Sequence, residues 1–369
     1  MTSKSNQKPD QILTVTTFAL IVFGLVMISS AGVAVSQLRF GDSYYFFKHQ
    51  LFFGVLPGLF LMFVAQKIDY HFWRKFAFLF FVVNLFLLML VFIPGFGLNF
   101  QGASRWLKLG PLSFQPSEML KLSIIIYLAA WFESKRELKT DLFEGLIPFL
   151  AILGLVGFLI IKQPDMGTLG IIVLIALSMY FISGAKTSHM VGMLGLGALA
   201  LWVLVKIESY RMNRFLVFLH PELDPRGIGY QINQALLAVG SGGLFGLGLG
   251  HSRQKFNYLP EPVGDSIFAI ISEEIGLIGA AALVILFIIF AMRGLKIVRY
   301  APDTFGKLLA VGITSWIVFQ ALINMAAILG LIPLTGVTLP FISYGGTSIV
   351  FSMAAVGILL NISKKCGKM

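Results

Sequence analysis

The sequence predicts an all-α integral membrane protein with about ten transmembrane helices, and three observations lead to this prediction. Of its 369 residues, 57% are hydrophobic and only 12% are charged, and the mean hydropathy is +0.87. A soluble domain of this length carries roughly a quarter charged residues. Ten apolar runs also reach the length of about 20 residues that a helix needs to cross a bilayer. We therefore treat residues 1–369 as a single polytopic membrane domain.

The ten predicted spans follow one another with short connections, except for one long gap. The first span is too long for the core of a cleavable signal peptide, so we expect it to be retained. The fifth and sixth are separated only by residues 162–165, which predicts a tight helical hairpin. The predicted spans lie near 12–35, 48–66, 76–95, 116–132, 145–161, 166–184, 189–205, 266–292, 305–330 and 344–362.

The distribution of basic residues predicts the orientation. Ten spans place both termini on one side, and the tails and short connections of that side carry sixteen lysines and arginines. The short connections of the other side carry five, and six more lie in the long gap, which counts for little in setting orientation. Both termini are therefore expected to be cytoplasmic. The same distribution explains the net charge of +11 without nucleic acid.

The long gap, about 206–265, is the predicted extracytoplasmic loop and the expected place of function. Its apolar stretch at 230–250 is too glycine-rich for an obvious span, so a re-entrant or interfacial helix is expected there. Gly242, Gly246 and Gly250 follow no strand and lead to no Gly-Lys-Ser/Thr, which excludes a phosphate loop. Their spacing of four residues instead suggests helix backbones that approach closely.

Other familiar site patterns are missing from the sequence. The single cysteine, Cys366, excludes an internal disulfide and metal sites built from cysteine clusters. The five histidines show no metal-ligand spacing. The Asp-x-Asp pattern of sugar-nucleotide transferases is also absent, so a sugar donor would be lipid-linked.

Charged residues within or at the ends of spans are functional candidates, since a charge costs roughly 3 kcal/mol at the bilayer centre. Glu118 and Lys121 are three residues apart at the start of the fourth span, where a structural ion pair and a functional pair are equally plausible. Asp165 begins another span, where capping the helix is the simpler interpretation. At least one of Glu273 and Glu274 is expected to face the bundle interior.

Asp265 ends the long loop and begins the eighth span, at the boundary between water and lipid. Its carboxylate would serve either as a general base or as a helix cap with a lowered pKa, and these residues alone favour the cap. Four of the six basic residues in the same loop form a candidate anion-binding group: Arg211, Arg214, Arg253 and Lys255. Arginine forks suit phosphate oxygens, and anionic lipid head groups are an equally good counter-charge.

Short motifs occur along the chain in a characteristic order. They include Gly102-Ala-Ser-Arg-Trp106, Gln115-Pro-Ser-Glu118, Gln163-Pro-Asp-Met-Gly167, Tyr210-Arg-Met-Asn-Arg214, Gly229-Tyr-Gln231, Gly240-Ser-Gly-Gly243, Tyr258-Leu-Pro-Glu261, Glu273-Glu274 and Leu339-Pro-Phe-Ile-Ser-Tyr-Gly-Gly346. Together they resemble the SEDS family (shape, elongation, division and sporulation), whose best-known members are FtsW, RodA and SpoVE. The resemblance covers nearly the whole chain and is closer to the FtsW division branch. Val263 and Gly264 stand where the family usually shows His-Thr before the aspartate.

This resemblance implies a peptidoglycan glycosyltransferase that polymerises lipid II on the outer face of the bacterial cytoplasmic membrane, for division or elongation. Asp265 would take the proton from the acceptor's 4-hydroxyl while undecaprenyl pyrophosphate leaves, which reverses the preference for a cap. No built-in cofactor is expected, and a Mg²⁺ or Mn²⁺ ion is compatible with the chemistry. Expected partners are a class B penicillin-binding transpeptidase and other division or elongation membrane proteins, but no nucleic acid. Substrate binding is expected of Arg105, Glu118, Lys121, Asp165, Arg211, Arg214, Arg253, Lys255 and Glu261.

Two other functions stay open on the sequence. The first is a lipid II flippase with Glu118, Lys121 and Asp165 along its route, although transporters often show inverted repeats that are not evident here. The second is a non-catalytic scaffold of the division machinery, which gives no reason for a re-entrant outer loop ending in a lone aspartate.

Overall fold

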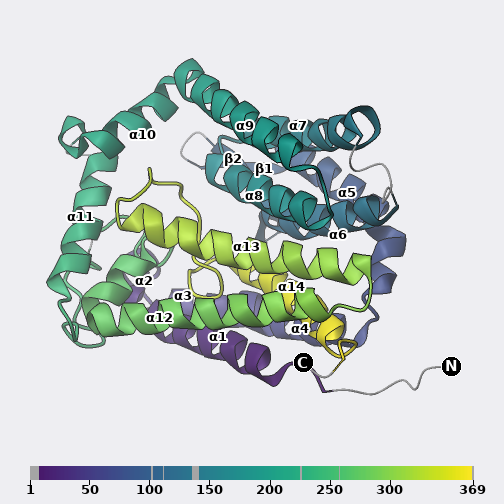
Figure 1. The fold of residues 1–369 in the computed structure, drawn as a ribbon. Coiled ribbons are helices and arrows are strands. Elements are labelled where there is room, and N and C mark those ends of the chain that lie inside the picture. The colour runs from purple at the N-terminus through teal and green to yellow at the C-terminus, as the bar shows by residue number, and fades with distance from the viewer. Residues whose placement is uncertain are drawn as a thin grey trace.

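The computed structural model of the chain is a bundle of long helices with one small sheet (Figure 1). It describes residues 8–367 except 101–102, 111, 135–140, 225–226 and 257. Gly102 of the first family motif lies outside the described residues. So do six of the basic residues counted for the orientation: Lys4, Lys135, Arg136, Lys139, Arg226 and Lys368.

A helix occupies each of the ten predicted spans, which confirms the polytopic helical fold. Eight of the described helices are long and apolar enough to cross a membrane. Of the other two, α8 is apolar but has 17 residues, and α6 has 19 residues and carries Glu118, Lys121 and Glu133. The spans are α1 (Gln11–Ala31), α3–η1–α4 (Tyr45–Gln50, Leu51–Val55, Leu56–Lys67), α5 (His71–Leu90), α6 (Pro116–Ser134), η2–α7 (Leu142–Leu146, Ile147–Lys162), α8 (Met166–Ile182), α9 (Thr187–Ile207), α12 (Ile267–Tyr300), α13 (Thr304–Ile328) and α14 (Gly346–Ser363).

Helices α13 and α14 form the interior of the bundle. Their most apolar windows are 72% and 83% buried, whereas that of α9 is 6% buried. Helix α13 packs against α6, α8, α12 and α14, and α14 packs most extensively against α4. In the part of the chain that is described, the side chains of α9 therefore face outward, as expected for a lipid-facing helix.

The predicted outer loop contains three helical segments rather than one. They are α10 (Ser209–Leu219), the short η3 (Pro221–Leu223) and α11 (Ile228–Ser241), which packs along α12. In Figure 1, α9, α10 and α11 follow one edge of the molecule. Helix α11 corresponds to the expected re-entrant or interfacial helix, but it ends at Ser241, before most of the glycines.

Residues 242–250 form an extended turn against a break in α12, and the helical interpretation of these glycines is wrong. Gly246 and Gly250 have φ values of +81° and +83°, which no helix contains. Helix α12 itself is broken at Gly276, with φ 71° and ψ −169°. Backbone hydrogen bonds cross the break, among them Gly248 N–H to the Glu274 carbonyl at 3.0 Å. The predicted close approach of two backbones is nevertheless present at Gly246, because a methyl group there would overlap the Glu274 carbonyl.

A three-stranded antiparallel sheet, which the sequence did not predict, lies between α5 and α6. Its strands are β1 (Gly97–Phe100), β2 (Ala103–Leu109) and β3 (Leu112–Phe114), in the order β1-β2-β3. Leu107 of β2 is the register partner of both Gly97 and Phe114. The sheet carries Arg105 and Trp106 toward the site described below.

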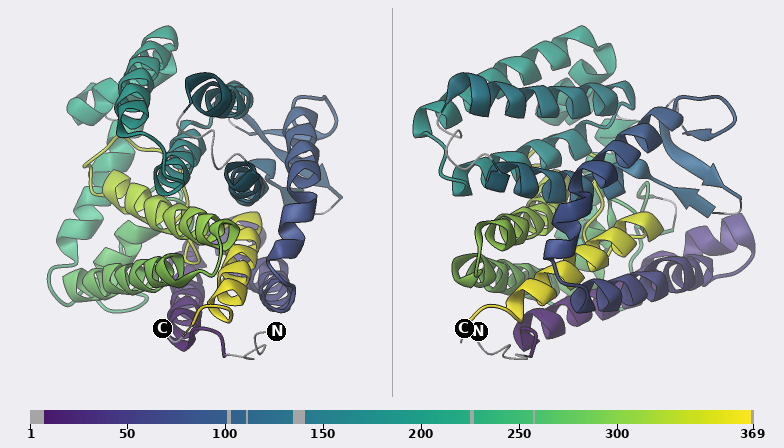
Figure 2. Two further views of the ribbon diagram at one scale, coloured as in Figure 1. Left: turned by 45° about the vertical axis from the view of Figure 1, so that its right-hand side comes forward. Right: turned by 90° about the vertical axis from the view of Figure 1, so that its right-hand side faces the viewer.

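The beginning of α1 and the end of α14 lie side by side at one end of the bundle (Figure 2). The Asp10 N–H donates to Ser363 Oγ at 3.0 Å, and the Asp10 carboxylate forms an ion pair with Arg293. With an even number of spans, both ends of the chain must lie on the same side of the membrane. The short helix α2 (Val33–Phe40), which follows α1, lies at the other end of that helix.

Candidate active site

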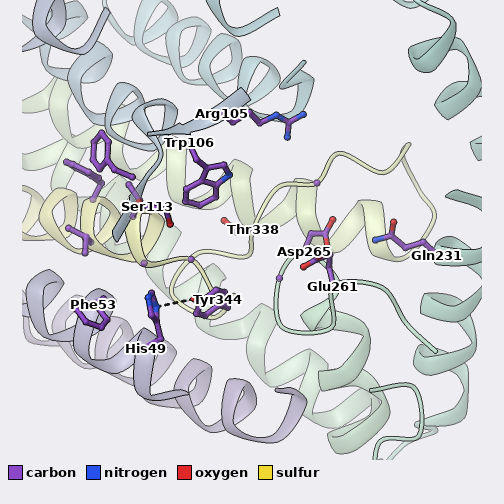
Figure 3. Close-up of a pocket in the computed structure, with 18 of the residues that line it drawn as sticks. His49, Phe53, Arg105, Trp106, Ser113, Gln231, Glu261, Asp265, Thr338 and Tyr344 are labelled. Carbon is purple, nitrogen blue, oxygen red and sulfur yellow. Dashed lines mark hydrogen bonds between the residues drawn. The ribbon is translucent and has the colours of Figure 1, made fainter. Parts of the chain in front are cut away.

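A cavity of about 650 Å³ opens among the sheet, the end of the long loop and the segment before α14 (Figure 3). Its charged lining residues are Arg105, Arg214, Glu261 and Asp265. Four of the ten residues predicted for the site are therefore brought together from β2, α10 and the loop before α12. The rest of its lining is polar or aromatic and includes His49, Phe53, Trp106, Gln231, Thr338 and Tyr344.

The backbone around Asp265 is held in place from three sides. A turn closes it locally, with the Gly264 N–H donating to the Glu261 carbonyl at 3.0 Å. From the segment before α14, Ser343 Oγ donates to the Gly264 carbonyl at 2.7 Å. From α13, Asn324 Nδ2 donates to the Asp265 carbonyl at 2.7 Å. The carboxylate is thus presented to the cavity by a fixed backbone.

The Asp265 side chain does not cap α12, so the cap interpretation is wrong. Ser266 holds the cap position, and no side-chain capping hydrogen bond is formed there in the described chain. The buried Asp265 Oδ1 has no hydrogen-bond partner among the described residues. Burial and the nearby Glu261 carboxylate raise the pKa of Asp265 to about 6, against an opposing effect of Arg214. A carboxylate with such a pKa is ionised at neutral pH and is a stronger base than an exposed aspartate.

Two arginines reach the cavity, each also bonded to the backbone. Arg214 Nη1 donates to the Leu334 carbonyl at 3.0 Å. Arg105 Nε donates to the carbonyl of residue 163 at 2.9 Å, and its Nη2 to that of residue 164. These bonds hold both guanidinium groups at the cavity, and Arg214 lies close enough to Asp265 to lower its pKa. Arg211 does not line the cavity. Its Nη1 donates instead to a carbonyl of α9 at 3.0 Å.

Arg253 and Lys255 lie away from the cavity, next to the two buried glutamates of α12. Lys255 Nζ forms a 2.9 Å ion pair with Glu274. The Arg253 N–H donates to Glu273 Oε1 at 2.9 Å, and Ser252 Oγ donates to the same carboxylate. Both glutamates are buried, which agrees with the expectation that at least one faces inward. This network attaches the loop that leads to Asp265 to the helix that follows it.

Glu118, Lys121 and Asp165 also lie outside the cavity, in structural contacts. Lys121 Nζ lies 2.8 Å from Glu118 Oε1 as a buried ion pair, and it donates to Gln320 Oε1 at 2.7 Å. Asp165 caps α8, accepting from the Thr168 N–H at 3.2 Å and from its hydroxyl at 2.9 Å. The ion pair and the cap, each of which the sequence left open, are thus both formed.

Several lining residues were not predicted as site residues. The His49 Nδ1 and the Tyr344 hydroxyl lie 3.0 Å apart, and burial raises the pKa of Tyr344 to about 12. Gln231 Nε2 donates to Ser266 Oγ at 3.2 Å. Gln231 and Tyr344 belong to the family motifs, which was the only signal available for them. His49 lies in an apolar helix with no local pattern around it.

Within the described residues, no group of three or more His, Cys, Asp or Glu side chains has the arrangement of a metal site. A Mg²⁺ or Mn²⁺ ion thus stays an expectation from the resemblance.

The family of cell cycle proteins FtsW, RodA and SpoVE matches residues 10–367. The chain belongs to this family. Stage V sporulation protein E of Bacillus subtilis (strain 168) is 45% identical over 365 residues, 99% of each chain. A relative from Geobacter sp. (strain M18), named probable peptidoglycan glycosyltransferase FtsW, is 40% identical over 96% of this chain and 97% of its own.

Solved structures share the fold of this chain. One is a chain from a study of how a peptidoglycan synthase complex coordinates polymerization and crosslinking. It has a TM-score of 0.80 and 26% identity over 97% of this chain and 98% of its own. The rod shape determining protein RodA of Thermus thermophilus has a TM-score of 0.71 and 25% identity over 98% of both chains.

Proposed function

We propose that this protein polymerises lipid II into glycan strands on the outer face of the bacterial cytoplasmic membrane. The observation that carries the proposal is Asp265, a carboxylate with a pKa raised to about 6 that lines one cavity together with two arginines. The relatives named peptidoglycan glycosyltransferase support the same chemistry. The cavity lies among the extracytoplasmic connections predicted from the charge distribution.

The reaction joins the 4-hydroxyl of an acceptor sugar to the anomeric carbon of a lipid-linked donor. Asp265 takes the hydroxyl proton as that oxygen attacks, and the bond between the anomeric carbon and the pyrophosphate oxygen breaks. Undecaprenyl pyrophosphate leaves with the electron pair. Arg105 and Arg214 offset the developing negative charge on its oxygens, which is the kind of fixed electrostatic stabilisation that contributes most in a water-poor site.

A divalent cation would accompany the pyrophosphate rather than occupy a protein-built cage. Mg²⁺ is commonly held by one or two carboxylates together with substrate phosphates, so the absence of a three-ligand group among the described residues is compatible with it. Polymerisation is expected to stop on addition of EDTA and to resume with excess Mg²⁺ or Mn²⁺. Undiminished polymerisation in EDTA would contradict the cation requirement alone.

The partner proposed for the chain is a class B penicillin-binding transpeptidase. A chain of the same fold comes from a complex in which polymerization and crosslinking are coordinated. A polymerase of this kind needs an enzyme that crosslinks its product, and other division or elongation membrane proteins would position the pair.

The test is reconstitution of purified protein with lipid II in proteoliposomes, with and without the transpeptidase. Glycan strands and released undecaprenyl pyrophosphate are the expected products. Lipid II that crosses the bilayer without being polymerised would identify a flippase instead. Absence of both activities, with the partner present, would leave a scaffold function.

A further inference from the structure

Two amide side chains on α13, Gln320 and Asn324, extend from the bundle interior to the cavity wall. They are four residues apart, so they lie on one face of the helix. Both are buried. Each donates to the backbone of the segment before α14, Gln320 to the Thr338 carbonyl at 2.9 Å and Asn324 to the Val337 carbonyl at 2.7 Å.

The orientation of the Gln320 amide is fixed by the chemistry of its neighbours. Lys121 Nζ and Trp316 Nε1 both approach one amide atom, each at 2.7 Å. An ammonium group and an indole N–H are donors only, so that atom must be the oxygen. The Nε2 group is thereby directed at Thr338, where it reaches the carbonyl and, at 3.3 Å, the hydroxyl Oγ1.

The Asn324 amide joins the cavity wall to the Asp265 turn. Its Nδ2 donates both to the Val337 carbonyl and to the Asp265 carbonyl, each at 2.7 Å. Carbonyl oxygens only accept, so this assignment is also unambiguous. Asp265 and Thr338 both line the cavity. The two amides therefore fix the place of the Asp265 backbone relative to the opposing wall.

We propose that Gln320 and Asn324 are positioning residues for glycosyl transfer, and that the buried Glu118–Lys121 pair acts on the reaction through Gln320. The inference rests on the proposed function. It gives Lys121 a role although its ammonium group does not line the cavity. Thr338 Oγ1 accepts from Gln320, so its own proton is directed to Ser348 Oγ, 3.4 Å away, or to a bound sugar or phosphate oxygen.

The variant that tests this proposal removes the amide N–H of Gln320, which donates to Thr338, and keeps an oxygen that accepts from Lys121 and Trp316. Gln320→Glu keeps an oxygen for Lys121 and Trp316 but loses the N–H that holds Thr338. We expect kcat to fall by roughly 10- to 100-fold with KM within about twofold, because misplacing a reacting group by about 1 Å costs this much in rate. The matched control is Ser315→Ala on the same helix, which is expected to keep the wild-type rate.

A double-mutant cycle tests whether Lys121 acts through Gln320. Glu118→Gln with Lys121→Met removes both charges together, so that neither is left buried alone. Combined with Gln320→Met, this pair should reduce kcat no further than Gln320→Met does, since coupled residues give non-additive losses. Independent, multiplicative losses would overturn the proposed route.

Hydrogen exchange of the purified protein gives a readout that does not depend on activity. In Gln320→Met the peptide spanning 334–343 should exchange faster than in wild type, by more than the overall loss of stability speeds exchange in peptides away from the cavity. Unchanged exchange there, or a fully active Gln320→Glu, would overturn the positioning role even where wild type polymerises lipid II. Lack of polymer from both wild type and Ser315→Ala would instead refute the proposed function, while the exchange result still decides whether the amides hold the wall.

Discussion

Replacing Asp265 by asparagine should abolish polymerisation and, at neutral pH, stabilise the fold. Asparagine has nearly the same shape but no charge. The folded protein raises the pKa of this carboxyl from 3.8 to about 6. At about 1.4 kcal/mol per pH unit, this shift means that ionising Asp265 in the folded state costs roughly 3 kcal/mol of stability.

The sign of the effect sets a pH window. Between pH 3.8 and about 6 the folded state binds the proton more tightly than the unfolded chain does. Stability contributed by this group is therefore present below pH 3.8 and is lost as the pH rises through about 6. The asparagine variant has no carboxyl group to ionise at this position, so it does not lose this stability as the pH rises. Its advantage over wild type should be near zero at about pH 4 and grow to at most roughly 3 kcal/mol above pH 7.

Thermal unfolding of both proteins in the same detergent, at several pH values, measures this difference. Asp42→Asn is the matched control. The hydrogen bond from Lys48 lowers the pKa of the exposed Asp42 carboxylate, so removing this charge is not expected to stabilise the fold at neutral pH. An Asp265→Asn variant that is less stable than wild type by the same amount at every pH would refute the reasoning. The carboxylate would then make a stabilising contact, as a helix cap does.

Three further predictions concern the Glu261 charge, the Arg105 guanidinium group and the close backbone approach at Gly246. Glu261→Gln removes a charge that raises the pKa of Asp265, so the acidic limb of the pH–rate profile should move from about 6 to lower pH; an unmoved limb would contradict this. Arg105→Lys keeps the charge but not the bidentate guanidinium group that offsets the developing charge, so kcat and kcat/KM for lipid II should both fall about tenfold in steady-state assays. Gly246→Ala should destabilise the fold by about 2 kcal/mol or more in thermal unfolding, whereas Gly240→Ala, in open space within α11, should not.

Hydrophobicity alone predicted the ten helices, because a bilayer requires long apolar runs whatever their partners. Local spacing also placed Glu118 and Lys121 within reach of each other in one helix, and their ion pair was one of the two interpretations that the sequence left open. The sheet at 97–114 escaped prediction because its strands have only three to seven residues. Such short strands carry too little alternation to be distinguished from a loop.

The site itself depended on contacts that no local pattern contains. Asp265 resembles a cap in sequence, and only its place against the segment before α14 shows that its carboxylate faces a cavity. His49, in α3, and Thr338, in the segment before α14, are far apart in the sequence and reach the cavity through packing alone. For the glycines at 242–250, the prediction of close backbone approach was correct, but the prediction of a helix was wrong. A spacing of four residues does not distinguish a helix from a series of turns.

The central claim is that the Asp265 carboxylate is the base in glycan polymerisation. Its most direct test is the rate of undecaprenyl pyrophosphate release from saturating lipid II by wild type and Asp265→Asn, each with the transpeptidase partner and each shown to be folded. Loss of release by about 10³-fold or more in the variant is predicted, since removing a general base typically costs 10²–10⁴-fold. Release by the variant within about threefold of wild type would show that the proton goes elsewhere and would contradict the claim.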